Sequence, residues 1–321
     1  MLVHTRRDDD AATRVSHVQH LRRSCHFVPG ANTRMLEKSL TTGADTLILD
    51  LEDAVTPERK DSARDTVAEW LAQADFRGKE RAVRMNSLDS PWGLKDLEIT
   101  MRHPPDAYVV PKVSTLDEIE TISREIERWA KVYGQNDDVG LILVSTETPL
   151  GALNVQTFGA CERVVALSWG AEDLSAALGA PRNRRPDGSY LDLYTHCRTM
   201  TLLAAAAANV QPIDTVYVDF NDPEGLAAEC QEAAWMGYTG KITIHPNQID
   251  IVNAAFTPAE DDVLEAQRLV AAFEEAQQAG LMAFSFDGNM VDAPHLHRAR
   301  RLIERAERIR QRTRPGGDIE T

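Results

Sequence analysis

Cysteine is scarce in this sequence, and the spacing of the cysteines argues against cysteine-based sites. The chain has 321 residues and four cysteines, Cys25, Cys161, Cys197 and Cys230. They form no C-x-x-C pair and no cysteine–histidine spacing typical of zinc. Scattered cysteines in a chain of this size are typical of reduced thiols, so we expect a cytoplasmic protein without a disulfide framework.

Long apolar segments and an excess of positive charge are also lacking. The apolar stretch 201–210 is too short to span a bilayer, and no apolar signal region follows the opening MLVHTRRDDDAATR. The formal net charge is -15, which argues against broad binding to nucleic acid or to an anionic membrane. We therefore expect a small-molecule partner, and an anionic one would need a local basic pocket.

What the sequence does contain is a regular alternation of short apolar runs with longer amphipathic segments. Runs such as LILDL and LILVS are typical of parallel strands covered on both faces, and the segment 118–132 has apolar residues at helical spacing. Eight such units predict a closed (β/α)8 barrel, with an open doubly wound sheet as the alternative. The eight expected strands are 25–28, 46–51, 81–84, 107–110, 139–144, 163–167, 215–219 and 241–244.

Beyond the eighth unit the sequence predicts a helical extension. Thr257 as N-cap and Pro258 in the first turn start a helix that ends near Gly280. The segment SFDGNMVD then forms a loop, and a basic helix begins near Ala293. We therefore divide the chain into a mobile amino-terminal tail (1–20), a (β/α)8 TIM barrel (21–256), C-terminal helices with their connecting loop (257–313) and a mobile tail (314–321).

In a barrel of this kind the functional groups lie where the strands end. Polar residues collect there, because the segments PG, DLED, RMN, PK, ETP, GAED and HP begin at residues 29, 50, 84, 111, 147, 170 and 245. Glu147 and Asp173 follow neighbouring strands, and two carboxylates with room for water suit Mg²⁺, which demands an octahedral oxygen shell. The alternatives are a hydrogen-bonded strand end for Glu147 and a helix N-cap for Asp173.

Arg84 follows the third apolar run, where its guanidinium can fork onto a carboxylate or a thioester oxygen. A structural salt bridge to Asp50 or Asp53 is equally compatible with the pattern. We expect Asp50 and Asp53 to hold metal-bound water, to orient Arg84 or to cap the turn, and capping is the interpretation we favour for Glu52. Lys112 follows a proline and is expected to contact substrate or a carboxylate instead of forming a Schiff base.

Nine segments occur in an order that resembles a known family. They are RRSCHFVPGANTRMLEKS, LILDLEDAV, RAVRMN, VPKV, TETPLGA, WGAEDLSAALGA, DTVYVDFND, GYTGKITIHPNQI and SFDGNMVD. Together they resemble the citrate lyase β-subunit-like family, which includes malyl-CoA and citramalyl-CoA lyases, over about residues 22 to 310.

The resemblance implies a (β/α)8 barrel with C-terminal helices, assembled as a homotrimer or a hexamer. It implies Mg²⁺, or Mn²⁺ in its place, held by Glu147 and Asp173, with Arg84 as the anion-binding arginine. It also implies that Asp292, in the loop SFDGNMVD, is the catalytic acid/base carboxylate and reaches the active site of a neighbouring subunit. Without the resemblance, Asp292 is best explained as an N-cap of the last helix.

The implied substrate is a CoA thioester. The implied reaction is the reversible cleavage of malyl-, methylmalyl- or citramalyl-CoA to acetyl- or propionyl-CoA and a 2-oxo acid. Substrate contacts are expected from Arg84, Glu147, Asp50, Asp53 and Lys112. Contacts to the CoA are expected from Arg23, Arg34 and Lys38.

The sequence departs from the family pattern at Cys25-His26, at Arg34, where lysine is usual, and over 194–198. The loop APRNRRPDG either grips CoA phosphates or is a solvated basic loop. Three other functions stay open: hydrolysis of a CoA thioester, a metal-dependent aldolase of 2-oxo acids without CoA, and a non-catalytic citrate lyase β-like subunit. His26 is the candidate histidine for the aldolase.

Overall fold

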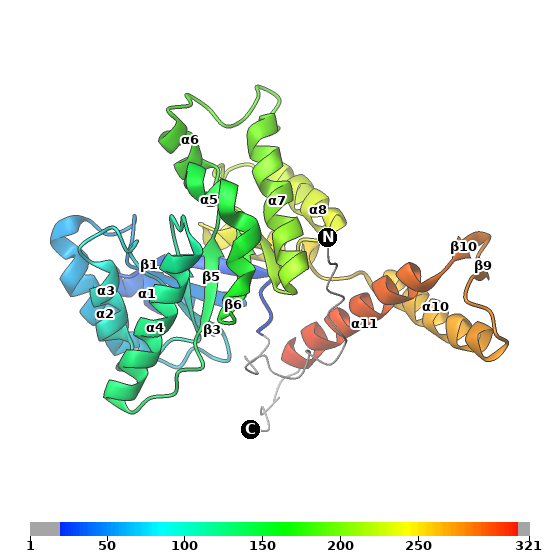
Figure 1. Cartoon of the computed structure of the whole chain (residues 1–321), viewed down its shortest axis with the longest axis horizontal. Helices are drawn as coiled ribbons and strands as arrows, with labels where there is room; N and C mark the ends of the chain where they lie inside the picture. Colours follow the sequence, from blue (N-terminus) through cyan, green and yellow to red (C-terminus); the bar gives the residue numbers. More distant parts are fainter. Residues whose placement is uncertain (1–19, 314–321) are drawn as a thin grey trace, which may run out of the picture. The chain divides into compact units, whose positions relative to one another are not determined.

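A computed structural model describes residues 20–313, and its first compact unit, up to Asn253, is a closed barrel of eight parallel strands (Figure 1). The barrel closes because β1 pairs with β8 as well as with β2, so the open doubly wound sheet is excluded. The strands are β1 (Ser24–Pro29), β2 (Thr46–Asp50), β3 (Glu80–Arg84), β4 (Ala107–Val110), β5 (Gly140–Val144), β6 (Val164–Ser168), β7 (Gln211–Asp214) and β8 (Gly240–Thr243).

Helices follow the strands and form the outer layer of the barrel (Figure 1). Helix α4 (Leu116–Tyr133) illustrates the local signals: the Thr115 side chain accepts the N–H of Glu118 at its start, and Gly134, with φ of 64°, ends it. No helix within residues 20–313 is long and apolar enough to cross a membrane. The remaining elements of this layer are α1 (Thr33–Ser39), η2 (Pro57–Arg59), α2 (Lys60–Gln73), α3 (Gly93–Thr100), α5 (Pro149–Asn154), η3 (Val155–Ala160), α6 (Glu172–Leu178), α7 (Asp192–Ala208), α8 (Pro223–Met236), η4 (Pro246–Gln248) and α9 (Ile249–Ala255).

Side chains of the strands alternate between the inside of the barrel and the helical layer. Ile48 of β2 belongs to an apolar cluster that includes at least one residue from each of the eight strands, so this cluster fills the barrel. Leu47 and Leu49 belong instead to the cluster shared with the helices. This period of two places Asp50, the last residue of β2, on the inner face at the carboxyl end of the strand.

The seventh strand is the one that the sequence misplaced. We expected it at 215–219, but β7 is Gln211–Asp214, and the ladder fixes it there because Leu167 pairs with Pro212 and Ile213 pairs with Gly240. Proline lacks a backbone donor and is disfavoured in a central strand, so the preceding QPID segment carried a weaker strand signal than TVYVD. The β-branched run TVYVD lies after the strand, in the segment that leads to α8.

The second compact unit begins at Ala254 and contains α10 (Glu260–Gln278) and α11 (Ala293–Thr313). The two helices run side by side, and a hairpin of β9 (Phe284–Phe286) and β10 (Asn289–Val291) lies at one end of the pair (Figure 1). The predicted cap at Thr257 is wrong, since Ala259 precedes the first turn without a side-chain cap.

The expected loop SFDGNMVD is in fact this hairpin. Its turn residues Asp287 and Gly288 both have positive φ, 45° and 83°, which is the conformation that Asp-Gly favours in a two-residue β-turn. The last helix begins at Ala293 as predicted. The compact units divide three residues before the predicted boundary at 256/257. The tails that we expected to be mobile lie outside the described residues, except for His20.

Candidate functional site

The first part of the site is an ion pair between neighbouring strands at the carboxyl end of the barrel. Asp50 and Arg84 are the last residues of β2 and β3, and the strand register places them opposite each other. Arg84 donates from Nε to Asp50 Oδ1 and from Nη2 to Asp50 Oδ2, both at 2.7 Å. The guanidinium also lies 4.3 Å from the centre of the Phe27 ring. The pair therefore follows directly from the period of two and from the register.

Arg84 is held as a cation with donors to spare. Burial by itself lowers its pKa, but the hydrogen bonds and charge of Asp50, with the charges of Glu52 and Glu147, outweigh burial and raise the pKa above its ordinary value. Asp50 accepts two of the five N–H donors of the guanidinium. The salt bridge that the sequence offered as an alternative is thus present with Asp50, and it leaves donors free for an anionic ligand.

Glu52 is a central member of the site that the sequence interpretation missed. Its Oε2 lies 2.9 Å from Nη1 of Arg84, and its Oε1 accepts a short hydrogen bond from Nζ of Lys112. Oε2 is buried without a hydrogen-bond partner among the described residues, and burial raises the pKa of this carboxyl despite both cations. The signal for it was available, because Glu52 belongs to the acidic segment DLED, which directly follows an apolar run at the functional end of the barrel.

Lys112 connects four carboxylates. Its Nζ lies 3.3 Å from Asp53 and 3.4 Å from Asp173, in addition to its contact with Glu52, and its backbone N–H donates to Glu147 Oε2 at 2.6 Å. Its backbone φ is 53°, a left-handed conformation that costs a non-glycine residue about 1 kcal/mol or more and is often found at functional sites.

The ammonium of Lys112 is also held in its charged form. Burial by itself lowers its pKa, but the hydrogen bond that it donates to Glu52 and the charges of the surrounding carboxylates raise the pKa above the ordinary lysine value. A Schiff base requires a neutral amine at working pH. Lys112 is therefore suited to carboxylate pairing and poorly suited to covalent chemistry.

Glu147 and Asp173, the two expected metal ligands, both contact Lys112 and lie in one group of like charges. Glu147 is 6% exposed, and its pKa is raised to about 8, first by burial and then by the negative charges of Asp173 and Glu52. A Cβ on Gly170 would lie 2.5 Å from Cγ of Glu147, so glycine is required where β6 leads into α6. Asp173 does not cap α6, since Ala171 occupies the N-cap position without a side-chain hydrogen bond.

The charges of this group are unbalanced, and the imbalance fits a divalent cation. Five carboxylates lie around two cations in contact with them, Arg84 and Lys112. Residues 20–313 contain no group of three or more His, Cys, Asp or Glu side chains that could hold a metal ion by themselves. Mg²⁺ does not need one, because it keeps several waters and is bound by one or two carboxylates. The five carboxylates are Asp50, Glu52, Asp53, Glu147 and Asp173.

Some predicted site residues lie elsewhere in the barrel. Arg23 precedes β1, and its guanidinium and backbone N–H bind the buried Asp45 at 2.9–3.0 Å at the opposite, amino-terminal end. This pairing supports a structural role for Arg23 and gives no support to the predicted contact with CoA. Arg34 and Lys38 are exposed on α1, which follows the carboxyl end of β1, so the two positions remain open to a ligand.

His26 faces away from the inside of the barrel. Its neighbours Cys25 and Phe27 belong to or pack against the interior cluster, while the His26 ring nitrogen Nδ1 lies 3.0 Å from Oγ1 of Thr243. Burial lowers the pKa of His26 to about 4, so the ring is neutral. A histidine in this position does not serve the aldolase chemistry that we had considered.

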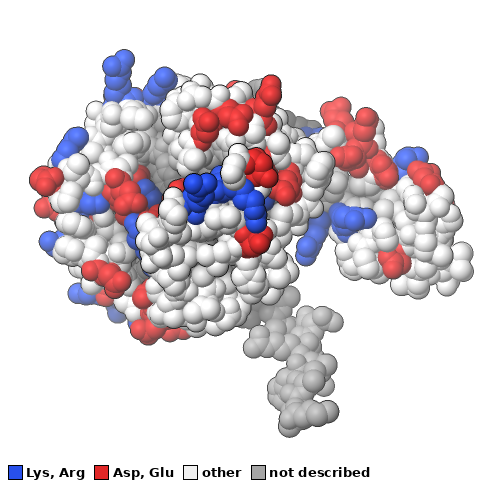
Figure 2. Space-filling model, turned by 90° about the horizontal axis from the view of Figure 1, so that it is seen from above, with Lys and Arg blue, Asp and Glu red and all other residues white. Residues whose placement is uncertain are grey.

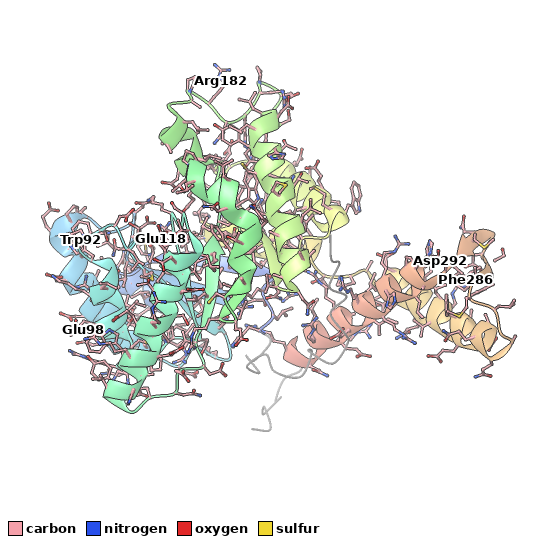
Figure 3. The ribbon with its side chains drawn as sticks, viewed as in Figure 1. Trp92, Glu98, Glu118, Arg182, Phe286 and Asp292 are labelled. Carbon is pink, nitrogen blue, oxygen red and sulfur yellow. The ribbon has the colours of Figure 1, made fainter. Side chains whose placement is uncertain are left out.

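Two arginines of the basic loop between α6 and α7 are paired with carboxylates of the helices α8 and α7. Arg184 lies 2.7 Å from Glu229 and 3.7 Å from the centre of the Tyr190 ring, and Arg185 lies 2.7 Å from Asp192. Arg182 projects from the same loop (Figure 3). Figure 2 shows acidic and basic side chains interspersed on the face it presents, without a broad basic surface.

Asp292 lies in the second compact unit, at the junction of β10 and α11 (Figure 3). Its Oδ1 is 2.7 Å from Nδ1 of His295, and its side chain is 52% exposed. Its backbone carbonyl accepts the N–H groups of His295 and Leu296, at 3.0 and 3.3 Å, in the first turn of α11, as the carbonyl of an N-cap residue does. Asp292 therefore stands at the N-cap position of α11, and its half-exposed carboxylate is still accessible.

Comparison with known proteins adds independent information on this chain. A family model described as HpcH/HpaI aldolase/citrate lyase matches residues 23–246. Citrate lyase subunit beta of Escherichia coli K12 is 39% identical over 287 residues, which cover 89% of this chain and 93% of that protein. The (3S)-malyl-CoA thioesterase of Cereibacter sphaeroides is 36% identical over 298 residues, covering 92% and 98%.

Solved structures show the same relationship. The CitE protein of Mycobacterium tuberculosis, in complex with magnesium, acetoacetate and coenzyme A, aligns with a TM-score of 0.74 at 31% identity. The alignment covers 90% of this chain and 100% of that one. RipC from Yersinia pestis aligns with a TM-score of 0.61 at 27% identity over 76% of this chain and 99% of that one.

Proposed function

Because this chain belongs to the HpcH/HpaI aldolase/citrate lyase family, we propose that it is a Mg²⁺-dependent lyase acting on a short 3-hydroxyacyl-CoA thioester. The observation that carries the proposal is that the buried Glu147 carboxyl lies beside the carboxylates of Asp173 and Glu52, a group of like charges that a divalent cation would neutralise. The relative complexed with magnesium, acetoacetate and coenzyme A supports the same ligands. The reaction breaks the C2–C3 bond and yields an acyl-CoA and a 2-oxo acid.

Glu147 and Asp173 would hold the metal, because Glu147 lies between β5 and α5, Asp173 lies in the first turn of α6, and both contact Lys112. Mg²⁺ bound there supplies a positive charge that acidifies the hydroxyl of the acid half of the substrate. Lys112 would pair with the neighbouring carboxylates Glu52 and Asp53, as it does in the free protein. Gly170 would allow Glu147 to keep this position, because any side chain at residue 170 would collide with the Glu147 side chain.

Arg84 would bind the thioester oxygen, where negative charge develops when the C2–C3 bond breaks. The bond's electron pair moves onto the thioester half, and a fixed cation beside that oxygen lowers the barrier. Asp50 and Glu52 would hold the guanidinium in place from behind. Such a donor acts without reorganisation because its partners already fix its direction.

Asp292 of a neighbouring subunit would move the proton. Cleavage needs one proton removed from the hydroxyl and one delivered to the enolate carbon, and an exposed carboxylate outside the barrel is suited to either transfer. This part of the proposal requires an assembly of several chains, a homotrimer or a hexamer. Arg34 and Lys38 are the remaining candidates for contacts to the CoA.

A panel of hydroxyacyl-CoA esters, assayed with Mg²⁺ and with EDTA, tests the proposed function. Metal-dependent release of acetyl-CoA or propionyl-CoA together with a 2-oxo acid is the expected result. Malyl, methylmalyl and citramalyl esters differ by a methyl group, which is worth roughly 1–3 kcal/mol in a pocket, so the panel also ranks the substrates. A protein without metal-dependent turnover of any ester would contradict the proposal and favour a non-catalytic subunit.

A second candidate function is hydrolysis of the thioester. It is favoured by the relatives named (3S)-malyl-CoA thioesterase, which are 35–36% identical to this chain. The same panel separates the two reactions, because hydrolysis releases free CoA and the intact hydroxy acid, whereas lysis keeps the CoA on the shorter acyl group.

A further inference from the structure

A buried lysine behind the site contacts none of the reacting groups directly, yet it binds the backbone that carries them. Lys60 is the first residue of α2 and is 6% exposed. Its ammonium donates to the carbonyl of Leu51 at 2.8 Å, to the carbonyl of Glu52 at 2.7 Å and to Oδ1 of Asn86 at 2.6 Å. The centre of the Trp92 ring lies 5.3 Å from it (Figure 3 labels Trp92).

This is a costly place for a cation. Burial lowers the pKa of Lys60, and the charges of Asp50 and Asp96 offset that effect only in part. The amino end of a helix carries a partial positive charge, which further disfavours a lysine there. A buried charge in such a position is retained only when its contacts compensate for the desolvation.

Those contacts use every donor of the ammonium. Three acceptors surround three N–H groups, so Lys60 has no hydrogen left to give to a substrate. Two of the acceptors are consecutive carbonyls, those of Leu51 and Glu52, which no regular strand would direct to a single cation. Lys60 therefore sets the course of the chain just after β2.

The third acceptor links Lys60 to the next strand. Asn86 stands two residues after Arg84, and its Nδ2 donates to the Leu51 carbonyl at 3.0 Å and to Asp96 at 2.6 Å. Asp96 in turn accepts from Arg64 at 2.8 Å. Two hydrogen-bonded links therefore connect the chain after β2 with the chain after β3. One runs from Lys60 to Asn86, and the other runs from Asn86 to the Leu51 carbonyl.

We propose that Lys60 is a positioning residue, whose ammonium fixes the Leu51–Glu52 backbone and Asn86 so that Glu52 meets Arg84 and Lys112 at the mouth of the barrel. The Glu52 carboxylate is the group that depends on this arrangement most. Its own contacts are with Arg84 and Lys112, while its carbonyl is bound from behind by Lys60.

The variant Lys60→Met tests the inference, because methionine is close in length and cannot bind the three oxygens. The kinetic arm rests on the proposed lyase function. We expect kcat to fall about tenfold or more, since small displacements of positioned groups cost up to a hundredfold, while KM changes little. The affinity for Mg²⁺ should stay within about twofold of wild type, because neither Glu147 nor Asp173 touches Lys60.

The matched control is Lys241→Met. Lys241 is the other buried lysine of the described barrel, and its Nζ lies 2.8 Å from Asp214 and 2.8 Å from Glu229, neither of which belongs to the five carboxylates of the site. Its loss should destabilise the fold, while the folded fraction keeps wild-type kcat. If Lys60→Met and Lys241→Met lose activity in the same proportion, loss of a buried charge is the cause, and the positioning role is wrong.

A double mutant identifies the group through which Lys60 acts. If it acts through Glu52, then Lys60→Met combined with Glu52→Gln should be no slower than Glu52→Gln alone. Multiplied losses would overturn the inference, because they would show that the two residues act independently.

A crystal structure of Lys60→Met completes the test without any assay. We expect the Glu52 carboxylate to leave Arg84 or Lys112. Unmoved positions of Glu52 and Arg84 would refute the inference whatever the activity. A wild-type protein that turns over no hydroxyacyl-CoA would instead refute the proposed function, and the displacement in the crystal would still decide the role of Lys60.

Discussion

The two ends of the barrel both hold buried charges, but their charges are satisfied to very different degrees. At the amino-terminal end, Arg22 binds Glu80 through Nε and Nη2 at 2.5–3.0 Å, and Gln211 and Thr46 complete the group at 2.5 and 2.6 Å. Each charge there has an opposite charge and matching hydrogen bonds. At the carboxyl end, Glu147 is crowded by other carboxylates and its pKa is raised to about 8 by burial first.

The difference shows what each end is for. A buried ion pair with complete hydrogen bonding holds strands together and has no need of a further partner. A buried group with excess charge of one sign stays incomplete until a cation or a ligand arrives, and such perturbed groups cluster at functional sites. The crowding of like charges at the carboxyl end therefore indicates a functional site there. The fully paired charges at the amino-terminal end serve as the structural comparison.

The largest expected effect comes from removing one carboxylate at each end. Glu80→Gln breaks a buried pair, so unfolding should become easier by about 3–5 kcal/mol, while the folded protein keeps its kcat. Glu147→Gln should do the reverse: turnover and Mg²⁺ binding are abolished, and the metal-free fold keeps or gains stability at neutral pH. Asp173→Asn should also lose metal and turnover. Denaturant unfolding in EDTA, calorimetric metal titration and the lyase assay measure these outcomes.

The same experiment has a clear failing result. Near-wild-type activity of Glu147→Gln or Asp173→Asn at limiting Mg²⁺ would show that the residue is not a ligand. Loss of turnover in Glu80→Gln at full folded fraction would remove the distinction between the two ends of the barrel.

The second effect is a pH dependence of stability that belongs to the carboxyl end. Glu147 has a raised pKa of about 8 when folded and an ordinary one near 4.5, so the folded state binds more protons between these values. Its contribution to stability is complete below pH 4.5 and is lost as the pH rises through 8. At about 1.4 kcal/mol per pKa unit, metal-free protein should lose up to about 5 kcal/mol over this range.

Unfolding of the metal-free protein from pH 5 to pH 9 measures this slope, with Glu147→Gln as the reference. The free energy of unfolding of the wild type, relative to that of Glu147→Gln, should fall as the pH rises from 4.5 to 8 and stay constant outside this window. Saturating Mg²⁺ should remove this fall, because the bound carboxylate is ionised. Parallel curves for the two proteins would mean that Glu147 is not proton-linked to folding.

The third effect concerns the arginine at the functional end. Arg84→Lys keeps a charge but loses the planar fork that binds Asp50, so we expect kcat to fall on the order of a hundredfold, as when an oxyanion donor is removed. Steady-state kinetics separate this outcome from a change in KM alone. A raised KM with unchanged kcat would assign Arg84 to uniform substrate binding instead.

Much of this organisation was readable from the sequence, because local rules decide it. Eight apolar runs with helical segments between them predicted the closed barrel, and residues just after those runs predicted which end carries the polar groups. Asp50 and Glu52 stand in the acidic segment that directly follows the second apolar run, and this position predicted that both lie at the carboxyl end of the barrel.

The rest depended on pairing partners that no local rule reveals. The ladder with β6 and β8 fixed the seventh strand at a proline-containing segment instead of the more β-prone run that follows it. Arg23 had the charge expected of a CoA contact, but burial against Asp45 at the amino end decided its role. Lys60 was not singled out by the sequence, because only the folded chain brings the carbonyls of Leu51 and Glu52 and the Asn86 side chain to its ammonium.

The last and smallest expected effect tests whether the carboxyl end is completed by another chain, whereas the amino end needs none. If Asp292 reaches a neighbouring barrel, inactive Arg84→Ala chains and inactive Asp292→Ala chains should complement each other when mixed. In randomly exchanged oligomers of equal amounts, about a quarter of the sites pair an intact Arg84 with an intact Asp292, so activity should return to about that fraction of wild type.

Mass spectrometry of a labelled chain must first show that subunits exchange, since locked oligomers cannot complement. A parallel mixture of Arg84→Ala with Glu147→Gln is the control, because both changes disable the barrel part of the site and no pairing restores it. Complete exchange without recovery in the first mixture would mean that Asp292 serves its own chain or has no role in proton transfer.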